Sequence, residues 1–130
     1  MLARPIREDD IPTVNAWWDA RDEGTMPAGV LPPCGVLVVD GETPVAAAWM
    51  YRPEGCKVGM IDWLVARPGM DAPITRKACR LAFTFLTMEA KRAGLSYLFA
   101  SVSRAGMEQE ALAVGFHVAS THNTHLVLPL

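Results

Sequence analysis

The chain has 130 residues, of which 51% are hydrophobic and 20% are charged, and its formal net charge is -2. This length suits one domain spanning residues 1–130, and the composition supports a buried core, which excludes a disordered chain. The slightly acidic balance argues against nucleic-acid binding, which normally requires a basic face. No apolar run reaches the roughly 18 residues of a membrane span, and the N-terminus lacks a signal-peptide pattern.

The cysteines and histidines predict neither disulfides nor a metal site. Cys34, Cys56 and Cys79 are an odd number without C-x-x-C spacing, which predicts three reduced thiols in a cytoplasmic protein. His122 and His125 lie three residues apart, and in an extended segment that spacing turns side chains to opposite faces. We therefore predict no metal site.

The N-terminal quarter predicts a short strand followed by a helix. Residues 3–7 are extended, and Asp9 or Asp10 can cap a helix that carries Pro12 in its first turn. Apolar residues then fall at helical spacing: Ile11, Val14, Trp17 and Trp18. Residues 24–33 hold two Gly and three Pro and are predicted to be a loop.

Three strands follow, with turn sequences between them. The apolar runs are residues 36–39, 45–51 and 57–66. Asp40-Gly41 separates the first two runs and residues 52–55 separate the next two, so the segment predicts an antiparallel meander.

The longest predicted helix covers residues 74–93, with Asp71 as its cap and Gly94 as its stop. Its predicted apolar face consists of Ile74, Ala78, Leu81, Ala82, Phe85 and Met88. Residues 95–102 form a strand that no hairpin turn precedes, so it should run parallel to the strand at 57–66.

A shorter helix at residues 105–114 ends at Gly115-Phe116, and the tail from residue 117 to 130 predicts two short strands. The element order is then β-α-β-β-β-α-β-α-β-β. This order predicts an α/β (α+β) domain with a mixed, mostly antiparallel sheet.

Three stretches, together with this order, resemble one known family. They are "VVDGETPVAAAW" around a D-G turn, "IDWLVARPG" at the end of the fourth strand, and "ALAVGFHV" at the end of the last helix. The chain resembles the acyl-CoA N-acyltransferase (GNAT) family along nearly its whole length. The resemblance implies acetyl transfer from acetyl-CoA to an amine, on a small molecule or a protein. The charge balance and the lack of a long apolar run predict that neither nucleic acid nor a membrane is a partner. A homodimer is left open.

The resemblance also implies where the cofactor would bind. In the family, the pantetheine arm lies between the fourth and fifth strands on exposed backbone, here at Leu64, Val65, Ala66 and Arg67. The pyrophosphate would lie at the start of the next helix. The family's glycine-rich loop is reduced here to Gly69, while Asp71 adds negative charge and Pro73 removes an amide donor.

Two cations could compensate for the missing phosphate loop. Arg76 and Lys77 stand close enough to the helix start to neutralise phosphate, although a charge run on a helix is also typical of a solvated face.

Asp62 is the predicted general base. Strand alternation places it in one row with Val58, Met60 and Leu64, and a poorly solvated carboxylate takes a proton readily. The alternative is an acid at the sheet surface or one paired with an arginine.

The general acid is harder to assign. The family's usual Tyr would stand at the position of Ala111, and Ser101 is the predicted substitute, with Ser103 as a second choice. Both could also be ordinary strand-end hydroxyls. Two further interpretations stay open: a catalytically degenerate GNAT-fold protein that acts as a binding or structural module, and a different α/β domain.

Overall fold

A computed structural model describes residues 1–27 and 29–130. The sheet has five strands in the order β1-β2-β3-β4-β5. They are β1 (Leu2–Pro5), β2 (Cys34–Asp40), β3 (Thr43–Tyr51), β4 (Val58–Ala66) and β5 (Tyr97–Ala100). A 3-10 turn, η1 (Glu8–Asp10), leads into α1 (Ile11–Asp19), and the other helices are α2 (Ala72–Arg92) and α3 (Ala105–Val114).

The strand directions confirm the predicted topology. β1 to β4 are paired antiparallel in chain order, whereas β5 runs parallel to β4. The parallel pair follows from the α2 crossover. A connection of this length can carry the chain back to the end of the sheet where β4 begins, so that β5 runs in the same direction. The mixed sheet predicted from the sequence is therefore present.

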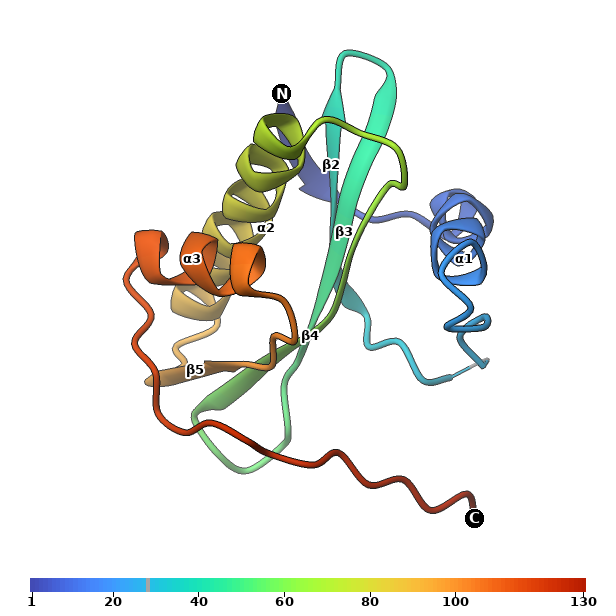
Figure 1. The fold of residues 1–130 in the computed structure, drawn as a ribbon. Coiled ribbons are helices and arrows are strands. Elements are labelled where there is room, and N and C mark those ends of the chain that lie inside the picture. The colour runs from blue at the N-terminus through green and yellow to red at the C-terminus, as the bar shows by residue number, and fades with distance from the viewer. Residues whose placement is uncertain (28) are drawn as a thin grey trace.

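Helices cover both faces of the sheet, so it has two cores. Figure 1 shows α1 on one face, and α2 with α3 on the other. On the α1 face, Trp18 packs on Trp49 with 5.6 Å between ring centroids, in a core that includes Val14, Trp17 and Leu37. The apolar stripe predicted for α1 is thus the face of this helix that packs on the sheet.

The buried face of α2 differs from the predicted one. Its buried residues are Ala78, Cys79, Ala82, Phe83, Leu86 and Ala90. The prediction missed four of them, Cys79, Phe83, Leu86 and Ala90, and it was wrong for Met88, which is 49% exposed. Apolar residues surround much of this helix, so periodicity alone could not identify the side that packs on the sheet.

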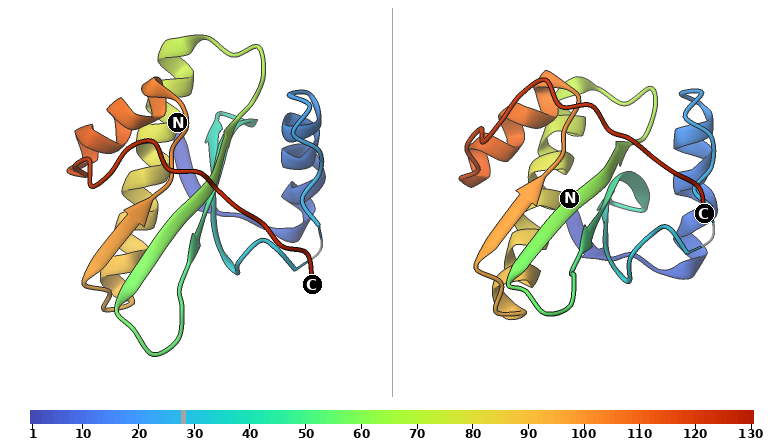
Figure 2. Two further views of the ribbon diagram at one scale, coloured as in Figure 1. Left: turned by 60° about the horizontal axis from the view of Figure 1, so that its bottom comes forward. Right: turned by 90° about the horizontal axis from the view of Figure 1, so that it is seen from below.

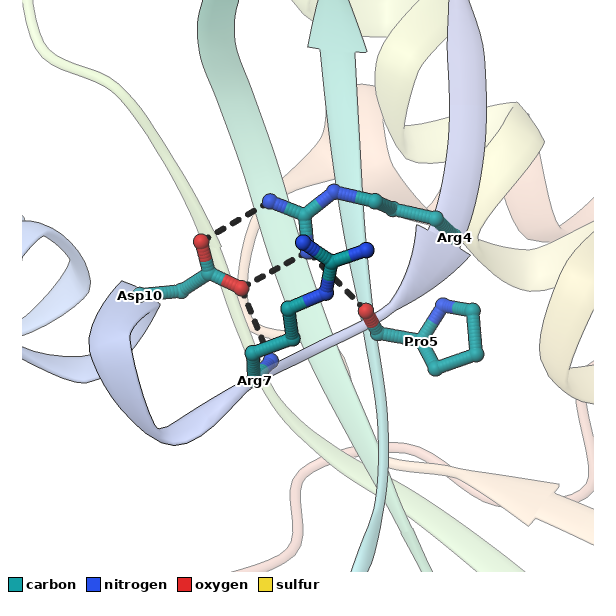
Figure 3. A network of polar contacts seen from close by, with 4 residues as sticks. All are labelled: Arg4, Pro5, Arg7 and Asp10. Carbon is teal, nitrogen blue, oxygen red and sulfur yellow. Dashed lines mark hydrogen bonds and ion pairs between the residues drawn. The ribbon is translucent and has the colours of Figure 1, made fainter.

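The predicted cap at Asp10 is also wrong in its detail. Asp10 stands at the N-cap position of α1 but makes no side-chain capping bond to that helix. Instead both of its carboxylate oxygens accept hydrogen bonds from Arg4, at 2.7 and 2.8 Å, and one accepts a third from the backbone N–H of Arg7 (Figure 3). The bidentate pair ties β1 to the turn that enters α1.

This ion pair makes stability depend on pH. The hydrogen bond from Arg4 lowers the pKa of Asp10 below its ordinary value, although partial burial opposes the shift. The pair therefore stabilises the fold above about pH 4, the ordinary aspartate range, and is lost as pH falls through the lower folded-state pKa. Asp10→Asn should lower the free energy of unfolding by about 1–2 kcal/mol at pH 7. Urea unfolding at pH 7 and pH 2.5 should show the difference from wild type shrinking at the lower pH.

The prediction of two strands in the tail is wrong. Residues 116–130 form no strand or helix, and Figure 2 shows this segment crossing the sheet from the α3 side towards α1. Leu126 and Val127 are 91% and 90% exposed. Val and Leu favour strands only where a neighbouring strand offers backbone partners and packing, and the tail has neither.

Two further features bear on chemistry. All three cysteines are free, and burial raises the pKa of the Cys79 thiol to about 11, which suits a core residue and not a nucleophile. Across residues 1–27 and 29–130, no helix combines the length and apolar character that crossing a membrane requires.

Candidate active site

The candidate site lies where β4 and β5 separate. Their parallel pairing runs from Val58–Tyr97 to Ile61–Ala100, and the N–H of Ser101 makes a last bond to the Ile61 carbonyl at 3.1 Å. Beyond that point β4 continues along β3 as far as Ala66, while the segment that follows β5 turns towards α3.

The separation opens a cleft of about 190 Å³. Its walls combine the outer half of β4, the segment after β5, the end of α1 and one residue of the tail. The lining residues are Trp18, Arg21, Glu23, Asp62, Trp63, Leu64, Val65, Ala66, Ser101, Val102, Ser103, Arg104, Met107 and His125. The predicted base Asp62 and the predicted acid Ser101 thus line one cleft.

A bulge in β4 changes which side chains share a face. Opposite Ala48 the register shifts, and Trp63 has a φ of 59°, a left-handed value that non-glycine residues rarely adopt. After the bulge, Leu64 packs in the α2 core and Val65 in the α1 core. The predicted common row of Asp62 and Leu64 is therefore wrong, because the extra residue reverses the alternation between them.

Two hydrogen bonds hold the bulge in place. The indole N–H of Trp63 donates to the Tyr51 hydroxyl oxygen at 2.7 Å, and that hydroxyl donates to the carbonyl of Val30 at 2.7 Å. The chain of bonds links β4, β3 and the loop before β2. Bulges and strained backbone often lie at functional sites, where neighbouring contacts maintain them.

Asp62 presents a carboxylate to the cleft. One of its oxygens accepts a hydrogen bond from the backbone N–H of Trp63 at 2.8 Å. None of the ion pairs among the described residues involves Asp62, so the alternative of an arginine-paired acid is not what the structure contains. The second carboxylate oxygen has no protein hydrogen bond in the described part of the chain.

Ser101 has a partner that the sequence did not predict. Its hydroxyl lies 3.0 Å from Nε2 of His125, which the crossing tail brings to the cleft. His125 was considered only as a metal ligand, and no group of three or more metal-binding side chains occurs among the described residues. The sequence held no signal for the contact, since 24 positions separate the two residues and only the path of the tail joins them.

The position of the family's usual Tyr is occupied by Ala111, which offers no hydroxyl to this cleft. Ala111 is 6% exposed and belongs to the core between α2 and the sheet. Next to it, Glu110 is buried and pairs with Arg80 of α2 at 2.7 Å. The predicted substitute, Ser101, lies in the wall of the cleft.

The four residues predicted to contact the cofactor lie at the end of β4 and directly after it. They differ in where their backbone N–H groups point. The N–H of Arg67 donates to the Val45 carbonyl of β3 at 2.7 Å, so this amide is already used. Because N–H groups alternate in direction along an antiparallel strand, the amide of Ala66 points away from β3, towards the separation. Leu64, Val65 and Ala66 all line the cleft, whereas Arg67 lies just beyond it.

The start of α2 offers limited anion binding. The first N–H to bond back in this helix is that of Thr75, to the Asp71 carbonyl, so the amides of Ala72 and Ile74 precede the helical ladder, while Pro73 has none. Arg76 and Lys77 are exposed, and neither is in any ion pair of the described residues. These two cations are free to meet an anion.

Comparison with known proteins rests on structure. No sequence model of a protein family matches the chain, and no curated protein matches it by sequence. Among solved structures, a mutant form of TTHA1254 from Thermus thermophilus superposes with a TM-score of 0.74 at 18% identity, over 99% of this chain and 98% of that one. An acetyltransferase from Trypanosoma brucei has a TM-score of 0.65 at 16% identity, over 99% of both chains.

The chain has the GNAT fold. A third structure, N-acetylglutamate synthase from Neisseria gonorrhoeae complexed with coenzyme A and N-acetyl-glutamate, has a TM-score of 0.65 at 21% identity. That match covers 92% of this chain but 28% of the synthase. The GNAT resemblance predicted from the order of the elements is confirmed for the fold, and at these identities the likeness carries no substrate with it.

Proposed function

We propose that the protein is an acyltransferase that moves an acetyl group from acetyl-CoA to an amine. The observation that carries the proposal is the cleft at the separation of β4 and β5, which has Asp62 and Ser101 in its walls. Coenzyme A is bound in the synthase structure of the same fold, and a CoA bisubstrate analogue in the AAC(6')-Iy structure, matched at a TM-score of 0.63. A cytoplasmic location belongs to the same proposal, supported by the three free thiols.

In this proposal the cofactor lies along the outer half of β4. Its pantetheine amides would bond the backbone of Ala66 that faces the separation, with Leu64 and Val65 lining the cleft beside it. Its phosphates would meet the first amides of α2, where the helix dipole favours anions. Arg76 and Lys77 would supply the charge that a glycine-rich loop supplies by amides in the family pattern.

The chemistry requires one proton acceptor and one proton donor. The amine nitrogen attacks the thioester carbonyl carbon, and Asp62, directly or through a water molecule, takes the proton that the nitrogen loses. The carbon–sulfur bond then breaks, and the Ser101 hydroxyl gives its proton to the leaving thiolate. His125, 3.0 Å away, can return a proton to Ser101, and exchange with solvent closes the cycle.

Calorimetry with CoA and with acetyl-CoA tests the cofactor site. Wild type should bind both, and the double variant Arg76→Ala, Lys77→Ala should bind each at least about tenfold more weakly, because charge-assisted contacts contribute about 1.5–3 kcal/mol. The double variant Lys91→Ala, Arg92→Ala removes the same charge at the other end of α2 and should bind like wild type. Equal affinity in all three proteins would show that Arg76 and Lys77 are only a solvated face.

The second candidate function is a binding module that has lost catalysis. It is favoured by the phosphate loop, where Gly69 stands alone and Pro73 lacks an amide donor, and by Ala111 in place of a Tyr. CoA binding without turnover on a broad amine panel would support this module. Absence of both CoA binding and turnover would reject the acyltransferase and decide for a non-catalytic binding or structural module.

A further inference from the structure

Two arginines from outside the sheet line the candidate cleft, and the proposed chemistry gives them no role. Arg21 follows α1, is half-buried, and donates a hydrogen bond to the Trp17 carbonyl at 3.3 Å. Arg104 immediately precedes α3. The two come from distant parts of the chain, and both line the cleft that also contains Asp62.

The charges of these arginines are poorly compensated. The pKa of Arg21 is lowered, first by burial and then by the positive charge of Arg104, with Glu23 acting in the opposite direction. The one ion pair that either makes in the described residues joins Arg104 to Glu23 at 4.0 Å, between side chains that are about half exposed. Two like charges held near each other, one of them half-buried, cost free energy, and Glu23 offsets this cost only in part because it is about half exposed and lies 4.0 Å from Arg104.

We propose that the acceptor carries an anionic group, a carboxylate or a phosphate, in addition to the amine that is acylated, and that Arg21 and Arg104 bind this group. The proposal rests on the proposed acyltransferase function and names its substrate class. A guanidinium presents a planar fork of N–H donors that matches both kinds of anion.

Asp62 in the same cleft explains why the ligand should also be an amine. Its carboxylate has no cation paired to it among the described residues. A zwitterion can satisfy both kinds of charge at once, with its amine towards Asp62 and its anion towards the two arginines. A simple polyamine would satisfy Asp62 but place positive charge beside Arg21 and Arg104.

Matched pairs of acceptors test this inference. We would compare kcat/KM for lysine and cadaverine, γ-aminobutyrate and propylamine, and phosphoethanolamine and ethanolamine, with thiol release from acetyl-CoA as the readout. The partner with the additional anion should be preferred at least about tenfold. The third pair distinguishes phosphate from carboxylate. Acceptors that give no turnover would be titrated by calorimetry into the complex with CoA.

Two double variants assign the preference to the arginines. The double variant Arg21→Gln, Arg104→Gln should abolish the preference for the anionic acceptor and leave CoA affinity unchanged. The charge-matched double variant Lys91→Gln, Arg92→Gln should retain that preference. The inference is overturned if no anionic acceptor reacts or binds, if the less anionic partners are preferred, or if the preference survives loss of both arginines. Each of these results leaves the acyltransferase proposal standing as long as CoA binds and some amine is acylated, and absence of CoA binding defeats that proposal instead.

Discussion

Replacing Asp62 with Asn should lower turnover by about 10²–10⁴, the range expected when a general base is lost. The carboxylate lies in the cleft wall beside the separated strands, and one of its oxygens is unbonded to protein in the described residues. Asn keeps the shape and can still accept the hydrogen bond from the Trp63 N–H through its amide oxygen, but it cannot take a proton. The change therefore removes the base while preserving the bulge.

Three measurements separate this effect from misfolding. Affinity for acetyl-CoA by calorimetry should be unchanged, since the carboxylate faces the acceptor, and the thermal unfolding midpoint should stay within a few degrees of wild type. Asp9→Asn, an exposed residue in η1, is the matched control and should retain full turnover. Full activity in Asp62→Asn would remove Asp62 as the base and point to an acceptor that arrives deprotonated.

Much of the fold could be predicted because local signals agree with it. The D-G turn between β2 and β3, the absence of a hairpin turn before β5, and the helix between β4 and β5 that ends before Gly94 follow from residues close together in the chain. The predicted cap of that helix is wrong in its detail, because Asp71 stands at the N-cap but makes no side-chain capping bond. A parallel pair joined by a helix then limits the topology to a few choices. These same features placed Asp62 and Ser101 at the ends of neighbouring strands, and the structure brings both to one cleft.

The details of the site could not be predicted, because they depend on contacts between distant segments. Trp63 adopts a left-handed backbone without being Gly or Asn, so its sequence carries no bulge signal, and Tyr51 with Val30 holds it in place. His125 reaches Ser101 only because the tail crosses the sheet as an irregular segment. Strand propensity predicted two short strands for that tail instead.

Ser101→Ala should be the second large effect, a loss of about 10²–10⁴ in kcat with little change in affinity for acetyl-CoA. A hydroxyl that gives its proton to the leaving thiolate acts when the carbon–sulfur bond breaks and contributes little to cofactor binding. Ser103→Ala is the informative comparison, because Ser103 also lines the cleft but has no hydrogen bond to His125. If the loss appears in Ser103→Ala and not in Ser101→Ala, then Ser103 is the acid.

His125 should act through Ser101 as a positioning residue, and a double-mutant cycle can show this. His125→Gln can still hydrogen-bond the Ser101 hydroxyl but cannot return a proton to it, so kcat should fall while the thermal unfolding midpoint and acetyl-CoA affinity hold. If the two residues form one relay, adding His125→Gln to Ser101→Ala should cost almost nothing further, because the first change has already removed the path. Effects on kcat that multiply would instead show that His125 acts independently of Ser101. In that case, the 3.0 Å contact would serve to hold the tail and not to move a proton.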